Sequence, residues 1–249
     1  MRKILTLLII VLIGKAALAQ DISVTAVTSP VSGCALTATE NVTIKIFNYG
    51  AMLPAGSTFN VNYTINAGPP VIELVTLVAN LLSNSTLTYT FTTQANLSVA
   101  GTYLFDASCA LAGDVNPSND TFSGYSVTNT AATVGGTVAG TNVCKGMNGG
   151  TLNLIGRTGN ILSWESSVDG GTTWVPISNT TTSQSYTNLT VQTKYRAQVQ
   201  NGACASAASS IATMTIDPVT VGGTVSGTAT VCSGANAGTM TSSGRTGNI

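Results

Sequence analysis

The sequence predicts an all-β protein made of tandem antiparallel β-sandwiches. Val, Ile, Thr and Tyr alternate with polar residues at a period of two along most of the chain, which is the pattern of half-buried strands. Turn-forming Asn, Asp and Gly residues separate these runs at intervals of about 8–12 residues. Part of the sequence also recurs at a spacing that matches one whole sandwich domain. No segment after the N-terminal region has a convincing amphipathic helix pattern.

Residues 1–19 have the pattern of a secretory signal peptide. Arg2 and Lys3 supply positive charge, Ile4–Ile13 is apolar, and Ala17-Leu18-Ala19 is a small-x-small cleavage site. The alternative is a membrane anchor, but the apolar run is too short to span the roughly 30 Å hydrocarbon core of a bilayer. We therefore expect a protein that is secreted or held at the cell surface, with no membrane insertion after cleavage.

Charged residues are scarce. They make up 7% of the chain, nine Lys and Arg balance nine Asp and Glu, and histidine is absent. A nucleic-acid partner is not expected, because such proteins present a basic surface. Histidine acid–base catalysis and histidine-ligated metals are excluded. The hydrophobic content of 43% favours folded domains over disorder.

Residues 20–129 are predicted to form the first sandwich. Strand patterns occur at Val42–Ile46, Val61–Ile65 and Leu87–Phe91. Val71–Leu82 is also apolar, and its β-branched residues and the prolines before it favour a strand over a helix.

Residues 130–217 are predicted to form a second sandwich of immunoglobulin-like type, with strands at Tyr195–Val199 and Ile211–Ile216. Two motifs of this segment return later in the chain, VGGTV from 134 to 221 and GRTGNI from 156 to 244, so the offsets are 87 and 88. Residues 218–249 are therefore a truncated copy of the second domain. Because so few strands cannot close a sandwich, we expect this sequence to be part of a longer protein.

The repeat predicts how the cysteines pair, since exported proteins commonly form disulfides. Cys144 and Cys204 fall inside one complete copy, and Cys34 and Cys109 fall inside the first domain. Cys232 matches Cys144 in the truncated copy, and its partner would lie beyond residue 249. We therefore expect disulfides Cys34–Cys109 and Cys144–Cys204, with Cys232 left unpaired.

The segment 167–174 fits the Asp-box pattern S-x-D-x-G-x-T-W. We interpret it as a structural hairpin turn, in which the Ser and Asp side chains bind backbone groups and the tryptophan covers the hairpin base. The alternative is a tryptophan that stacks against a sugar. Trp164 lies in an apolar run and is predicted to be a core residue. The Asp-box residues are Ser167, Asp169, Gly171 and Trp174.

The segment 114–120 is the densest cluster of oxygen-bearing side chains. Such oxygens could bind Ca²⁺, although the cluster lacks the spacing and the terminal Glu of an EF-hand loop. We favour an Asx- and Pro-rich turn between two strands, and expect no metal site. The weak calcium candidates are Asp114, Asn116, Asn119 and Asp120.

No catalytic motif is present. The chain has no G-x-S-x-G elbow, P-loop or dinucleotide fingerprint, and its serines lack a histidine base. A pair of carboxylates could in principle serve a glycosidase, but none stands in a recognisable motif. We therefore expect no enzyme activity and no cofactor.

Each domain contains stretches that are typical of a known module. In the first domain they are Gly33–Leu36, Val42–Gly50, Val61–Gly68, Leu97–Tyr103 and Leu111–Asp120, and in the second Trp164–Gly171, Lys194–Val199 and Asn201–Cys204. By these stretches, residues 21–128 resemble a CARDB-like, immunoglobulin-type module of secreted bacterial proteins, and 134–217 resemble the Ig-like (PKD-like) repeats of large surface proteins of gliding Gram-negative bacteria. The resemblance implies tandem sandwiches and adhesins exported by the type IX route.

These observations together predict a secreted or cell-surface structural and adhesion protein, a non-catalytic stalk of immunoglobulin-like domains. Its partner would be an extracellular protein or glycan surface. The first alternative is an accessory region of a secreted hydrolase whose catalytic domain is not in this sequence. The second is a carbohydrate-binding module that uses Trp174.

Overall fold

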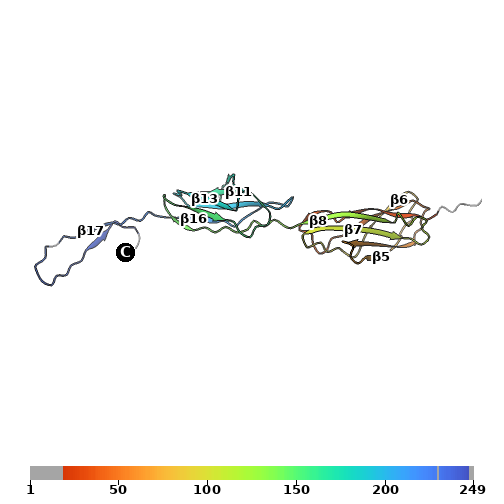
Figure 1. The fold of residues 1–249 in the computed structure, drawn as a ribbon, viewed down its shortest axis with the longest axis horizontal. Helices are drawn as coiled ribbons and strands as arrows, with labels where there is room; N and C mark the ends of the chain where they lie inside the picture. Colours follow the sequence, from red (N-terminus) through yellow and green to blue (C-terminus); the bar gives the residue numbers. More distant parts are fainter. Residues whose placement is uncertain (1–18, 229, 247–249) are drawn as a thin grey trace, which may run out of the picture. The chain divides into compact units, whose positions relative to one another are not determined.

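The computed structural model describes residues 19–228 and 230–246 (Figure 1). Within these ranges the chain forms strands β1 to β18 and no helix, which confirms the all-β prediction. The signal peptide that we expect over residues 1–19 lies outside the described residues except for Ala19. None of the described segments is a helix long and apolar enough to cross a membrane. The chain divides between Thr130 and Ala131 into unit 1 and unit 2.

Unit 1 is a sandwich of two sheets. The first sheet has the order β1-β3-β6 and is antiparallel throughout. The second has the order β2-β8-β7-β4-β5, in which only the pair β2 and β8 is parallel. The strands are β1 (Ile22–Ser29), β2 (Gly33–Cys34), β3 (Thr43–Asn48), β4 (Thr58–Ile65), β5 (Val71–Thr76), β6 (Ser85–Thr90), β7 (Gly101–Ala110) and β8 (Thr121–Thr130).

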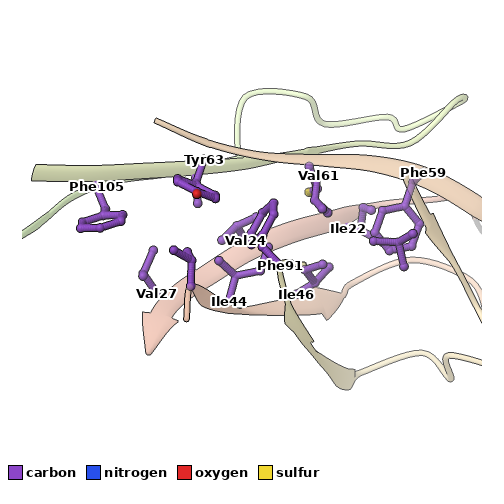
Figure 2. Close-up of a cluster of buried hydrophobic side chains, with 14 of the residues drawn as sticks. Ile22, Val24, Val27, Ile44, Ile46, Phe59, Val61, Tyr63, Phe91 and Phe105 are labelled. Atoms are coloured by element: carbon purple, nitrogen blue, oxygen red, sulfur yellow. The ribbon is translucent and has the colours of Figure 1, made fainter. Parts of the chain in front are cut away.

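The core of unit 1 lies between these sheets (Figure 2). Alternation along β4 turns Phe59, Val61 and Tyr63 inward and leaves the residues between them outside. The Tyr63 ring packs edge-on against Phe91, with centroids 4.8 Å apart. Burial of each such side chain contributes about 1.5–3 kcal/mol. The predicted strand within Val71–Leu82 is confirmed for β5, and the chain then turns away as a loop.

Unit 2 repeats this arrangement with a smaller first sheet. A pair of strands, β10 and β13, faces a sheet of order β12-β11-β14-β16-β9, and β15 adds to β14. Again one pair, β9 and β16, is parallel. The strands are β9 (Asn142–Cys144), β10 (Gly149–Asn153), β11 (Asn160–Ser167), β12 (Val175–Ile177), β13 (Ser183–Thr187), β14 (Thr193–Gln200), β15 (Ala207–Ala208) and β16 (Ala212–Asp217).

Trp164 on β11 is fully buried at the centre of the unit 2 core, as the sequence predicts. Its indole Nε1 donates a hydrogen bond to the backbone oxygen of Thr181, at 2.9 Å. The described residues after Asp217 contain the paired strands β17 (Thr224–Ser226) and β18 (Thr241–Ser243). They are exposed apart from Ser242, so they build no core of their own.

The predicted disulfide between Cys34 and Cys109 is wrong, because Cys109 is a free, buried thiol. Cys34 lies opposite Thr130 at the end of β8. The backbone N–H of Cys109 instead donates to the backbone oxygen of Asp120, just before β8 begins. The two cysteines therefore lie at opposite ends of β8. A strand of its length spans roughly 30 Å, whereas a disulfide needs Cα atoms about 4.4–6.8 Å apart.

The predicted disulfide between Cys144 and Cys204 is wrong for the same reason. Cys144 is an exposed free thiol on β9, opposite Asp217 at the end of β16. Cys204 follows the far end of β14, which runs antiparallel to β16, so the two cysteines lie at opposite ends of unit 2. Cys34 and Cys204 are instead the disulfide-bonded cysteines, and Cys232 carries a free thiol.

Candidate functional site

The polar cluster around Asp114 lies in the connection between β7 and β8. The Asp114 carboxylate accepts hydrogen bonds from the backbone N–H groups of Ile22 (2.9 Å) and Asn116 (2.8 Å). The Asn119 amide donates to Asp21 at 3.0 Å, and the Ser23 hydroxyl donates to the Asn119 backbone oxygen. These contacts fasten the connection to the start of β1, as expected of a structural turn.

Asp120 is the most unusual member of this cluster. It is buried, and neither its Oδ1 nor the Oδ1 of Asn119 has a hydrogen-bond partner. Burial, followed by repulsion from Asp114 and Asp21, raises the pKa of Asp120 to about 6. Across the described part of the chain, no group of three or more His, Cys, Asp or Glu residues is arranged to hold a metal ion.

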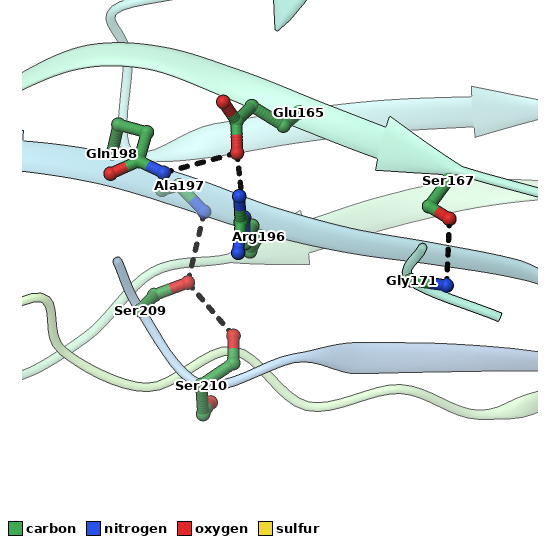
Figure 3. A network of polar contacts seen from close by, with 8 residues as sticks. All are labelled: Glu165, Ser167, Gly171, Arg196, Ala197, Gln198, Ser209 and Ser210. Carbon is green, nitrogen blue, oxygen red and sulfur yellow. Dashed lines mark hydrogen bonds and ion pairs between the residues drawn. The ribbon is translucent and has the colours of Figure 1, made fainter. Parts of the chain in front are cut away.

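The Asp-box segment forms the turn between β11 and β12. The Ser167 hydroxyl donates to Asp169 at 2.7 Å. It also accepts the Gly171 backbone N–H at 2.8 Å (Figure 3). Asp169 also accepts the backbone N–H groups of Thr172 and Thr173, both at 3.0 Å. Hydrogen bonds from Thr173 and Ser167 hold the pKa of Asp169 well below its usual range. The Ser167 hydroxyl and the Asp169 carboxylate are thus both occupied by partners within the turn.

Trp174 is half-buried, and the Arg196 guanidinium carbon lies 4.0 Å from its ring centroid. Arg196 Nε in turn contacts Glu165 Oε2 at 2.6 Å, and the Gln198 amide donates to the same oxygen at 3.1 Å (Figure 3). Sugar stacking requires an open aromatic face, and here the cation takes one face. Sequence reasoning missed Arg196, because only the register of β11 against β14 brings it beside Glu165.

A cavity of about 490 Å³ opens on the flank of unit 1, between the edge strands β5 and β6. We call it the flank cavity. Its wall carries no charged residue and includes the exposed Leu74, Val78 and Leu82. The apolar run from Val71 is the only sequence signal for it. The lining residues are Leu74–Leu82, Ser85–Leu87 and Tyr89.

Glu73 on β5 bridges the two sheets beside this cavity. Its carboxylate accepts hydrogen bonds from the Tyr89 hydroxyl (2.7 Å), from the Thr92 backbone and hydroxyl (3.0 and 2.7 Å) and from the Thr93 backbone (2.8 Å). Burial would raise the pKa of Glu73, but these hydrogen bonds outweigh it and lower the pKa to about 2. Glu73 is therefore a structural acceptor and is poorly suited to acid–base chemistry near neutral pH.

The comparisons with known proteins give a partial family match and distant structural likenesses. Residues 133–218 match the model of a family described as a domain of unknown function, DUF8696. No curated protein matches the chain significantly.

Solved structures similar to the chain include a CARDB domain and domains of immunoglobulin and fibronectin-III type. The CARDB domain of a Pyrococcus furiosus protein, solved with di-metal ions, is 15% identical, with a TM-score of 0.29 over 45% of this chain and 89% of that chain. Titin domains A168–A170 are 16% identical, with a TM-score of 0.38 over 80% and 67%. Fibronectin(III)-like modules of Clostridium thermocellum CbhA are 14% identical, with a TM-score of 0.30 over 78% and 94%.

Proposed function

We propose that this chain is a non-catalytic structural stalk of an extracellular adhesion protein, secreted or held at the cell surface. The observation that carries the proposal is the succession of two β-sheet units, each with its own hydrophobic core. Such units resist extension one at a time and can hold a binding region away from a surface. The leader pattern at residues 1–19 and the disulfide-bonded Cys34 and Cys204 support export.

The contacts of the acidic side chains also support a non-catalytic role. Glu40 and Asp106 accept hydrogen bonds from the backbone N–H groups of Thr37 and Gly124, and Glu165 is paired with Arg196. Glu73 and Asp169 are held in their ionised forms by several donors each. A general acid needs a pKa near the working pH, and the lowered pKa values of Glu73 and Asp169 do not meet this condition.

Single-molecule stretching of residues 20–249 tests the stalk. Two separate unfolding events are expected, one for each core, because each unit is a cooperative structure of its own. Extension without resolved unfolding events would contradict the proposal, and so would turnover of glycoside or ester substrates by the purified chain. Recovery of the exported chain with Gln20 as its first residue would support the expected cleavage site.

The carbohydrate-binding alternative depends on Trp174. Because Arg196 covers one face of its ring, we expect no specific signal when the chain is applied to a glycan array. Binding that is lost in Trp174→Ala and kept in Trp164→Phe would favour this alternative over a stalk without ligand contacts of its own.

A further inference from the structure

The start of β1 and the connection from β7 to β8 bring three acidic residues together in unit 1. The Ile22 backbone N–H donates to the Asp114 carboxylate at 2.9 Å, and the Asn119 amide donates to Asp21 at 3.0 Å. Asp120 follows Asn119 directly. We call Asp21, Asp114, Asn119 and Asp120 the acidic cluster. The bonded residues are 92 and 98 positions apart in the chain, so only the fold assembles this cluster.

The Asp120 side chain points inward, between the two sheets. The register of β7 against β8 pairs Ser108 with Thr121, so the next pair is Cys109 with Asp120. The Cys109 N–H donates to the Asp120 backbone oxygen at 3.1 Å, which continues the ladder. Residues directly opposite each other share a face of the sheet, and Cys109 belongs to the core. Asp120 therefore lies on the inner face as well, and only 8% of its surface is exposed.

Two side-chain oxygens of the acidic cluster lack a partner. They are the Oδ1 atoms of Asn119 and Asp120, and both are buried. Asp114 and Asp21 both repel the charge of Asp120, which places the three carboxylates near one another. Among the described residues, the ion pair is that of Arg196 in unit 2, so no Lys or Arg neutralises this group. Buried charges in proteins are normally paired or bound to a metal ion.

A divalent cation meets this deficit better than a water molecule does. Water can donate hydrogen bonds to the two oxygens, but it leaves the repulsion among the carboxylates in place. Calcium offsets the charge and accepts carboxylate, amide and water oxygens in a flexible arrangement, whereas magnesium requires near-ideal octahedral geometry. In the described chain, no three acidic residues are arranged to hold an ion by themselves. Amide and water oxygens would therefore complete its coordination.

We propose that the acidic cluster of unit 1 binds one calcium ion, with Oδ1 of Asp120 and Oδ1 of Asn119 as its buried ligands. Asp21 and Asp114 add the negative charge that attracts the ion. The bound ion ties the start of β1 to the connection before β8. With few carboxylate ligands, we expect a dissociation constant on the order of 10⁻⁴ to 10⁻³ M. The inference concerns ion binding and does not rest on the proposed stalk function.

Thermal unfolding of residues 20–249 tests the proposal. The chain is first treated with a chelator, and calcium chloride is compared with sodium chloride at equal ionic strength. Far-UV circular dichroism follows both units, while tryptophan fluorescence follows unit 2 alone, since Trp164 and Trp174 both belong to it. About 10 mM calcium should raise the melting temperature of unit 1 by roughly 5 °C and leave that of unit 2 unchanged. Isothermal titration calorimetry should report one site.

Asp120→Asn is the decisive variant, because it keeps the shape of the side chain and removes the buried charge. The calcium-dependent rise in melting temperature should disappear. Without calcium, the variant should be at least as stable as the wild-type chain, since the repulsion from Asp114 and Asp21 is relieved. A residue with only a structural role would instead show the same loss of stability with and without calcium.

Glu40→Gln is the matched control, because it removes a carboxylate from the other end of unit 1. Glu40 accepts the Thr37 backbone N–H at 2.7 Å, and the Thr37 oxygen accepts the Leu97 N–H. The Leu97 oxygen accepts the amide of Asn129, near the end of β8, whereas Asp120 precedes its beginning. Glu40→Gln should therefore keep the full calcium response.

The wild-type chain alone is enough to overturn the proposal. A melting temperature of unit 1 that does not respond to calcium would do so, and so would an equal rise in both units, which is a general salt effect. Stabilisation of unit 1 by acid, without any calcium response, would assign the two buried oxygens to a proton instead. Persistence of the calcium response in folded Asp120→Asn would remove Asp120 from the site and contradict the proposal as well.

Discussion

Uncharged amide side chains, buried and fully bonded, fasten the loops of unit 1 to its sheets. Asn48 is fully buried, and its amide donates to the backbone oxygens of Ala51, Leu81 and Leu82 at 2.8–3.2 Å. Its own oxygen accepts the Gly50 N–H at 3.0 Å. A buried carbonyl without a hydrogen-bond donor loses its hydration and gains no bond in exchange, which costs free energy. One such asparagine can therefore determine whether a loop stays packed against the sheet.

Asn48→Ala is expected to destabilise unit 1 by about 2–3 kcal/mol, since several buried backbone groups lose their partner. Urea denaturation followed by far-UV circular dichroism measures the loss. Asn62→Ala is the matched control, because its amide bonds only the half-buried Ser108 hydroxyl, which can turn to water. Equal losses in the two variants would show that burial of these bonds does not decide their value.

Glu73 gives unit 1 a defined dependence on pH. Its pKa is about 2 in the folded chain and 4.5 in the unfolded reference, so the folded state favours the ionised carboxylate. The stabilisation is present above pH 4.5 and is lost as the pH falls towards 2.

Glu73→Gln is expected to cost about 1–2 kcal/mol at neutral pH, the scale of a hydrogen-bonded charge that is partly exposed. The difference between the wild-type chain and the variant should shrink as pH falls from 4.5 towards 2. Chemical denaturation of both proteins across this range measures it. A constant difference would mean that the carboxylate charge contributes nothing.

At the scale of the element, the segment before β9 is held by close backbone approach. A Cβ on Gly140 would collide with the backbone of Thr213 on β16. The Thr215 backbone N–H also donates to Thr141 at 3.1 Å. A side chain cannot enter this contact, and the repeat keeps glycine at the matching position, Gly227.

Gly140→Ala is therefore expected to destabilise unit 2 by about 1–3 kcal/mol, because the segment must shift away from β16. Tryptophan fluorescence during urea denaturation reports it, since Trp164 and Trp174 both belong to unit 2. Gly149→Ala is the control, because its added Cβ would make only ordinary contacts at 3.5 Å and beyond. If Gly140→Ala and Gly149→Ala lost the same stability, the general effect of replacing a glycine would be responsible, and not the close approach of Gly140 to Thr213.

The strands themselves were predictable, because a period of two is a local property. The patterns at Val61–Ile65 and Tyr195–Val199 correspond to β4 and β14. The position of Arg196 was not predictable, because its stacking on Trp174 depends on which strand lies beside β14. The flank cavity was missed for a related reason, since it exists only where the edges of two sheets meet.

At the scale of the whole molecule, each unit has its own core, and both tryptophans belong to unit 2. Far-UV circular dichroism should therefore report the unfolding of both units, while tryptophan fluorescence reports unit 2 alone. Asn48→Ala should shift only the unfolding transition of unit 1, which tryptophan fluorescence does not detect. Gly140→Ala should shift only the transition of unit 2, which fluorescence detects. Movement of both transitions by either substitution would reveal a single cooperative structure.

The sequence alone determined the strand content, the turn at Ser167–Trp174 and the core position of Trp164. These depend on residue type and on neighbours a few positions away, where chain geometry is fixed by the backbone. Only the tertiary structure decided which cysteines are bonded and which face of Trp174 is covered. Sheet order sets which strand ends come together, and it joins residues that are far apart in the chain, so spacing along the sequence could not reveal it.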